Sequence, residues 1–351
     1  MRYLPINQVQ KGMILGQELY DGKGNLLLPK YTKLTADHIS YITFQGITGI
    51  YIDDTFSKEV EIREVLEPAV RRETLRAINN LFCRALEGEP ITEPEEVALR
   101  AKVEKVVSEV LDDQDVLYNL LELKTFDGYT YSHSANVAVV AAVLGAKCCL
   151  DESQLKELTM AGFLHDIGKV YVDAEIINAP RRLTEIERAK VMDHPRLGYE
   201  FLRENYHFSE TVDRCVYEHH EWYNGGGYPC RKKSNDILFL ARILKVADVF
   251  DAMTSNRSYH APYLPYEVME YIMARSGMEF DPEVVDVASK ELSIYPVGCE
   301  VELSTGAHAI IVRNHRGYSM RPTIKMCDGG EVVDLSDSSK NRNITITRLL
   351  M

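Results

Sequence analysis

Histidine and carboxylate side chains gather in a few short segments in the middle of the chain, and these residue types bind metal ions. The segments are YSHSAN, FLHDIGK, MDHPR, YEHHEWY and KVADVFDAM. Imidazole and carboxylate are ligands that borderline divalent metals such as iron, manganese and zinc accept. Helices of a bundle that point such side chains inward can build a dinuclear site. A single histidine in a helix is usually a satisfied core or surface residue, but seven candidates in one region predict a metal centre: His133, His165, Asp166, His194, His219, His220 and Asp248.

A glycine-rich loop directly follows the histidine pair. In NGGGYP, three consecutive glycines end at Gly227, and Tyr228 and Pro229 come next. Glycine tolerates positive φ and lets a backbone or a ligand approach closely, and proline stiffens the exit of the loop. The Tyr228 ring can stack on a base, and its hydroxyl can bind a phosphate. We therefore expect a ligand-binding loop beside the metal centre, with an inert turn as the alternative.

Helices must position these side chains, because residues 124–294 show helical spacing almost throughout. Apolar residues recur at three- and four-residue steps in SQLKELTMAGFLHDIG and NDILFLARILKVADVFDAMTS. The sequence thus predicts a mainly α fold, in which a helical bundle carries the metal site. Residues 1–55 predict a small β-containing module with one helix, N-capped by Thr35 and ending near Phe44. Residues 295–351 return to alternation and predict a β-rich extension with the strand segments VGCEVELST, AHAIIVRNH, RPTIKMCD and NITITRLL.

Residues 56–123 form a connector between the β module and the bundle. Two amphipathic helices are predicted there, in VEIREVLEPAVRRETLRAINNLFCRALEG and PEEVALRAKVEKVVSEVLDD, with a loop between them. Their apolar faces can pack on the next domain, form the seam of a homodimer, or carry a signal between domains. The same spacing also suits helices with a purely structural role.

The composition of the chain limits which binding partners and which cellular compartment we expect. The net charge of −13 argues against binding a nucleic acid polymer, which needs a basic surface. A small phosphate ligand is still compatible, because bound metal ions reverse the field locally. The seven cysteines are odd in number and form no CxxC pair, which indicates reduced thiols. Because no apolar stretch approaches the roughly 18 residues of a membrane span and the N-terminus lacks a signal-peptide core, we expect a cytoplasmic protein without membrane contact.

The motifs resemble a known family. FLHDIGK resembles the signature of HD-domain metal-dependent phosphohydrolases, and HHEWYNGGGYP resembles the second signature of the HD-GYP subfamily, bacterial cyclic di-GMP phosphodiesterases. The resemblance continues in DGYTYSHSANVA and VADVFDAMTSNRSY, so it covers residues 124–294, while residues 1–55 resemble more weakly the small domain that often precedes HD-GYP domains. It implies hydrolysis of cyclic di-GMP to pGpG or onward to GMP, with two divalent ions, iron or manganese.

The resemblance also implies roles for individual residues. All seven candidate ligands match metal-binding positions of the family. Lys169 matches the lysine near the scissile phosphate, and it lies one turn from His165 on the same predicted face. We expect it to stabilise phosphate charge or to protonate the leaving oxygen; simple capping of a helix end is the alternative. Substrate contacts are expected from Gly227, Tyr228, Pro229 and Arg257. From their positions in the sequence, Glu221 is expected to orient an imidazole, and Asp251 is expected to do the same or to act in proton transfer.

Three positions depart from the family pattern. Tyr129 stands where some members carry a glutamate that binds a third metal, so two ions are expected and the ligand role of His133 is less secure. Asn224 replaces the usual aspartate at the start of the loop, and His260 replaces a basic residue that often follows Arg257. We expect the changes at Asn224 and His260 to affect loop order or substrate affinity.

Two alternatives remain open at this stage. The motifs indicate that a phosphodiester bond is cleaved, but they say less about which base the substrate carries. Another cyclic dinucleotide such as cyclic GMP-AMP is therefore an alternative substrate. A receptor with weak catalysis, which binds the dinucleotide and signals through the connector, is the alternative from another class. The retention of all candidate ligands favours the enzyme.

Overall fold

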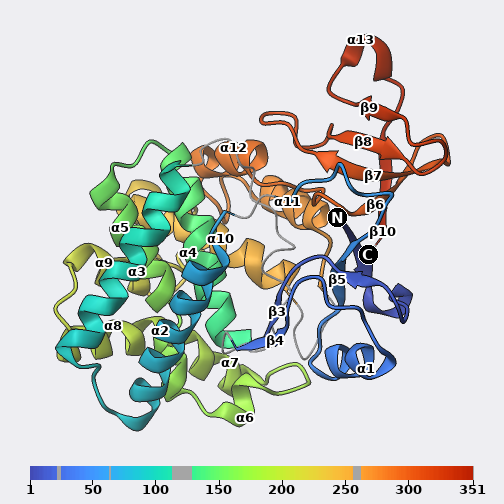
Figure 1. Ribbon diagram of the computed structural model, residues 1–351. Coiled ribbons are helices and arrows are strands. Elements are labelled where there is room, and N and C mark those ends of the chain that lie inside the picture. The colour runs from blue at the N-terminus through green and yellow to red at the C-terminus, as the bar shows by residue number, and fades with distance from the viewer. Residues whose placement is uncertain (22–24, 63–64, 113–128, 256–261, 351) are drawn as a thin grey trace.

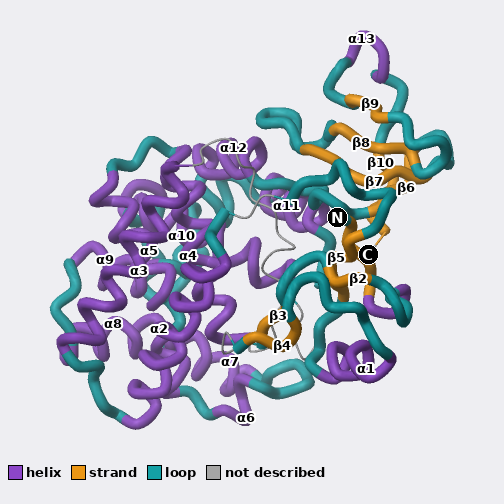
Figure 2. Tube along the Cα trace, viewed as in Figure 1, coloured by secondary structure: helices purple, strands orange, loops and turns teal. Residues whose placement is uncertain are grey.

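Helices dominate the computed structural model, which describes residues 1–21, 25–62, 65–112, 129–255 and 262–350 (Figure 2). The prediction of a mainly α fold is confirmed. A helical bundle forms one side of the molecule, and two β-containing parts lie on the other side (Figure 1). The longer helices of the bundle are α4 (Tyr129–Lys147), α5 (Glu152–Leu164), α8 (His194–Asn205), α9 (Glu210–Glu218), α10 (Phe239–Thr254), α11 (Pro265–Ala274) and α12 (Pro282–Glu291).

The N-terminal part is a small antiparallel sheet with one helix and its own core. Strands β1 (Arg2–Pro5), β5 (Gly49–Asp53) and β2 (Ile14–Leu15) pair in that order, and β3 (Leu19–Tyr20) pairs with β4 (Leu26–Leu28). Helix α1 (Ala36–Phe44) begins after Thr35, whose hydroxyl accepts a hydrogen bond from the His38 amide at 3.1 Å. The predicted helix and its cap are therefore confirmed.

The connector consists of α2 (Pro68–Glu87) and α3 (Glu93–Asp112). The first helix starts later than the apolar spacing predicts, because Pro68 at its first position fixes a helical φ while lacking the amide that an earlier turn would need. Both helices bury their apolar residues in the same core as α4 and α5. Of the predicted alternatives, packing on the bundle is what the structure shows, and a homodimer through the connector would have to use the remaining faces.

The C-terminal part is a five-stranded antiparallel sheet in the order β10-β6-β7-β8-β9. The predicted segments hold β6 (Glu300–Leu303), β7 (His308–Arg313), β8 (Thr323–Met326) and β10 (Ile346–Leu350), whereas β9 (Val332–Asp334) and the short helix α13 (Ser338–Asn341) were not predicted. This sheet docks on the N-terminal part, where the Tyr3 amide donates to the Gly298 carbonyl at 2.9 Å and the Tyr51 hydroxyl donates to the Val297 carbonyl at 3.1 Å.

Helices long and apolar enough to span a membrane do not occur in the described part of the chain.

Candidate metal centre

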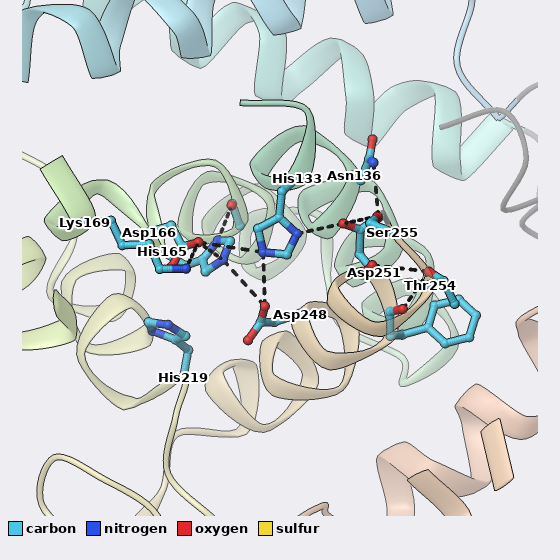
Figure 3. A network of polar contacts seen from close by, with 12 residues as sticks. His133, Asn136, His165, Asp166, Lys169, His219, Asp248, Asp251, Thr254 and Ser255 are labelled. Carbon is cyan, nitrogen blue, oxygen red and sulfur yellow. Dashed lines mark hydrogen bonds and ion pairs between the residues drawn. The ribbon is translucent and has the colours of Figure 1, made fainter. Parts of the chain in front are cut away.

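Several bundle helices bring predicted ligands, among them His133, His165, Asp166, His219 and Asp248, to one buried point (Figure 3). His133 projects from α4, and Asp248 projects from α10, which packs on α4. The other ligands follow or begin a helix: His165 and Asp166 after α5, His194 at the start of α8, His219 and His220 after α9. All seven are at least partly buried, and His165 and His219 are fully buried. The structure therefore assembles every residue that the sequence put forward as a metal ligand.

Helix ends fix the orientation of three of the imidazoles. Nδ1 of His165, His194 and His219 each lies within hydrogen-bond distance of the carbonyl three residues earlier, at 2.9, 2.7 and 2.6 Å respectively. Those carbonyls belong to the last turn of a helix, where no amide of the same helix can reach them. With Nδ1 as the donor, the lone pair of Nε2 is left for the centre of the cluster, which is the form of imidazole that binds a metal.

A carboxylate orients the fourth imidazole. Nδ1 of His133 lies 2.7 Å from Oδ2 of Asp251, one turn beyond Asp248 on α10. The other carboxylate oxygen of Asp251 accepts a hydrogen bond from Nδ2 of Asn136 at 3.1 Å. This arrangement directs Nε2 of His133 towards Asp248, whose Oδ1 is 3.2 Å away. Asn136 is a site residue that sequence analysis missed, although its spacing of three residues from His133 places both on one helical face.

The distances within the cluster suit cations. Ligand atoms of His194, His219 and His220 lie within 4.8 Å of one another, and so do those of His133, His165 and Asp248. Nε2 of His194 is only 3.3 Å from Nε2 of His219, and both rings use Nδ1 as the donor, so two lone pairs face each other. A cation between the two nitrogen atoms would replace the repulsion of their lone pairs with two coordination bonds.

Burial keeps most of these imidazoles neutral. It lowers the pKa of His194 to about 4 and lowers the pKa values of His219 and His220 well below the usual range. For His133, burial also lowers the pKa, but the hydrogen bonds to Asp248 and Asp251 outweigh it and raise the pKa to about 9. Nε2 of His165 and Oδ1 of Asp166 are buried without a hydrogen-bond partner among the described residues. Neutral imidazoles and open acceptor atoms fit a divalent metal site.

Lys169 lies at the edge of the cluster and contacts it directly. It belongs to the 3₁₀ turn η3 (Ile167–Tyr171), and its Nζ lies 2.5 Å from Oδ2 of Asp166. Burial opposes ionisation of Asp166, but the positive charge of Lys169 and the neighbouring histidines lower its pKa well below the usual range. The contact that the structure shows for Lys169 is with Asp166, the neighbour of His165. About one-fifth of the Lys169 side chain remains exposed.

The glycine-rich loop lies against the same histidines. The Tyr228 ring stacks on His220 with centroids 4.8 Å apart, and burial raises the pKa of Tyr228, which keeps its hydroxyl protonated. A Cβ on Gly227 would come within 2.2 Å of the Trp222 amide nitrogen, so only glycine fits there. The close approach predicted for Gly227 is thus made with the chain's own backbone.

The structure also bears on the predictions for Glu221 and Asn224. Glu221 accepts hydrogen bonds from the amides of Cys230 and Lys232, at 2.6 and 3.0 Å. It holds the end of the loop, so the prediction that it orients an imidazole is wrong. Asn224 accepts a hydrogen bond from the Gly226 amide at 2.9 Å, as an aspartate in its place would. The predicted contacts of Arg257 and His260, and the side chain of Tyr129, lie outside the described residues.

Comparison with known proteins identifies the bundle. Residues 115–284 match the HD domain family. The chain contains an HD domain. A cyclic di-GMP phosphodiesterase of Pseudomonas aeruginosa is 36% identical over 225 residues, which are 64% of this chain and 54% of that protein. A 3'3'-cGAMP-specific phosphodiesterase of Vibrio cholerae is 32% identical over 176 residues, which are 50% of this chain and 34% of that protein. The resemblance to the HD-GYP family is confirmed by relatives of this kind.

The fold likeness extends beyond the HD domain. The structure of an HDG"Y"P protein from Bdellovibrio bacteriovorus superimposes with a TM-score of 0.53 at 14% identity, covering 81% of this chain and 97% of that one. This match bears on the fold alone. The chain spans about half the length of the Pseudomonas relative.

Proposed function

We propose that this HD domain hydrolyses a phosphodiester bond of a cyclic dinucleotide, with cyclic di-GMP as the leading substrate. The observation that carries the proposal is the convergence of imidazole Nε2 atoms with Asp166 and Asp248, beside the Lys169 ammonium. The relatives named as cyclic di-GMP and 3'3'-cGAMP phosphodiesterases support this substrate class, and cyclic GMP-AMP is the second candidate. The expected products are pGpG or, after a second cleavage, GMP.

In this proposal, the seven clustered residues hold two divalent metal ions. When bound, these ions would supply Lewis-acid stabilisation of the phosphoryl oxygens and a nucleophile from water at neutral pH. The mixture of imidazole and carboxylate ligands suits iron or manganese, and this choice of metal is part of the proposal. Asp251 and the three helix-end carbonyls orient the imidazoles, so they act through the ligands and not on the substrate.

The substrate would be held by residues on one side of this cluster. Lys169 is proposed to neutralise charge on the phosphoryl group or to protonate the leaving oxygen, because its ammonium lies at Asp166 and its side chain is partly exposed. Tyr228 offers the face of its ring for a guanine and its protonated hydroxyl for a phosphate. Gly227 and Pro229 shape this surface, and Arg257 is proposed to bind a phosphate or a guanine edge.

Turnover of cyclic di-GMP by anaerobically purified protein loaded with iron or manganese tests the proposal. We expect pGpG or GMP to appear only with metal, and Asp166→Ala to reduce turnover about a hundredfold or more, because it removes a ligand and the partner of Lys169. Asp286→Ala is the matched control, since this carboxylate is exposed and pairs with the exposed Lys290.

Product analysis separates the alternatives. If cyclic GMP-AMP is turned over faster than cyclic di-GMP, cyclic GMP-AMP becomes the leading substrate. The proposed reaction, hydrolysis of a phosphodiester bond, then stays the same. Tight binding of both dinucleotides without turnover under any metal condition would refute the enzyme and favour the receptor.

A further inference from the structure

Helix α10 carries two ion pairs that include no proposed metal ligand. Nζ of Lys245 lies 3.1 Å from Oε1 of Glu279, and these side chains are only 7% and 6% exposed. One turn earlier, Nη1 of Arg242 lies 2.5 Å from Oδ2 of Asp281, with 13% and 4% exposure. Both acids belong to the segment between α11 and α12, residues 275–281, which we call the brace. Two buried ion pairs therefore fix the brace to α10, the helix that also carries Asp248.

The brace in turn holds the start of the glycine-rich loop. The Tyr223 amide donates to the Glu279 carbonyl at 3.2 Å, and the Asn224 amide donates to the Met278 carbonyl at 2.9 Å. Glu279 thus contacts α10 through its side chain and the loop through its backbone. The carboxylate is held in place further by the Tyr271 hydroxyl, which donates to Oε2 at 3.1 Å. A continuous chain of contacts leads from α10 through Glu279 to the loop that carries Tyr228.

Stability alone does not account for a pair of this kind. Removing two charges from water is costly, and apolar residues of similar volume usually stabilise a fold at least as well. A buried ion pair does fix one relative placement of the elements that it joins, because any displacement leaves a charge unpaired. The brace must be placed accurately, since its carbonyls set where Tyr223 and Asn224 begin the loop. The opposite end of the loop is fixed separately by Glu221.

We propose that Lys245 and Glu279 are positioning residues for the glycine-rich loop, and that their ion pair sets the loop in the place where it receives the substrate. The effect on substrate rests on the proposed function, whereas the effect on the loop does not. Neither residue needs to contact the substrate for this role. Loss of the pair would release the start of the loop and leave the metal ligands in place.

The sole tryptophan of the chain makes the loop directly observable. Trp222 precedes Tyr223, and its ring lies against Gly226 within the loop. We expect Lys245→Met to increase the quenching of Trp222 fluorescence by acrylamide and to raise KM for cyclic di-GMP about tenfold, with kcat changed less than about twofold. Metal content should equal that of the unaltered protein. Lys290→Met is the matched control, because Lys290 forms an exposed pair with Asp286.

Glu279→Gln provides an independent variant that keeps the carbonyl bonded to Tyr223 and the volume of the side chain. If Lys245→Met does not fold, Glu279→Gln by itself tests whether the ion pair positions the loop. Unchanged quenching and unchanged KM in the folded variants would overturn the proposal, and so would a loss of stability with a parallel loss of kcat and no change in KM. If the unaltered protein does not turn over cyclic di-GMP, the proposed function fails, and the quenching of Trp222 still decides whether the pair positions the loop.

Discussion

At the scale of single residues, the tautomers of four imidazoles, those of His133, His165, His194 and His219, are decided by neighbours outside the metal cluster. Three histidines use Nδ1 at a helix-end carbonyl, and His133 uses it at the Asp251 carboxylate. The carbonyl contacts are local and follow from chain geometry. The contact of His133 joins two helices and depends on a side chain that must accept twice, from His133 and from Asn136.

Asp251→Asn should therefore weaken metal binding without removing a ligand. An amide has one acceptor oxygen, so it cannot serve both His133 and Asn136, and its NH₂ group must face one of these donors. We expect metal affinity to fall about tenfold, as measured by competition with a chelator. Asp286→Asn makes the same chemical change at an exposed site. An affinity equal to that of the unaltered protein would show that Asp251 does not orient the ligand.

At the scale of elements, the metal centre depends on a close contact between η3 and α8. Gly168 lies in η3, and a Cβ built on it would stand 2.0 Å from the His194 carbonyl oxygen and 2.5 Å from the Gly198 amide nitrogen. Both contacts are with backbone, which cannot rotate away. Glycine at this position lets α8 approach closely enough for His194 to reach Asp166, to which its Nε2 lies at 3.3 Å.

Gly168→Ala should displace α8 and separate these two ligands. We expect the free energy of unfolding to fall by about 2 kcal/mol, because the added methyl group overpacks a rigid contact. Metal content should fall as well, which distinguishes this variant from one that is merely less stable. Urea denaturation and metal analysis provide the two measurements, with Glu204→Ala on the exposed side of α8 as the control. Full metal content in Gly168→Ala would contradict the explanation.

At the scale of the whole molecule, the connector and the HD domain share one hydrophobic core. Buried residues of α2 and α3 belong to the same cluster as those of α4, α5 and α10, whereas the N-terminal part also has a small core of its own. The connector is therefore part of the structure that holds the metal centre. A signal that moved α2 would act on this core directly.

Ile78→Ala tests this shared core. Ile78 lies in α2 and is fully buried, so its truncation should lower the free energy of unfolding by about 3 kcal/mol. We expect circular dichroism, which follows all helices, and Trp222 fluorescence, which follows the loop beside the metal centre, to shift together in urea. A transition seen by Trp222 at its original midpoint would show that the connector unfolds as a separate unit.

Signals that act over a few residues could be read from the sequence. Helical spacing predicted the bundle, Thr35 predicted the start of α1, and the types of seven clustered side chains predicted the metal centre. Helical spacing also placed α2 too early, since the first apolar residues of that segment precede Pro68 without being helical. The strand β9 was missed because three residues carry too little alternation to be recognised.

The sequence by itself determined which residues could bind metal and which elements would carry them, because residue chemistry and periodicity are local properties. Only the tertiary structure decided which atoms meet. His133 and Asp251 are 118 residues apart, and Lys245 on α10 reaches Glu279 in the brace. Their pairing depends on how α4, α10 and the brace pack, and packing is set by the whole core at once. Glu221 is a second example. Its position next to His220 can be read from the sequence, but its hydrogen-bond partners, the amides of Cys230 and Lys232, depend on how the glycine-rich loop folds back.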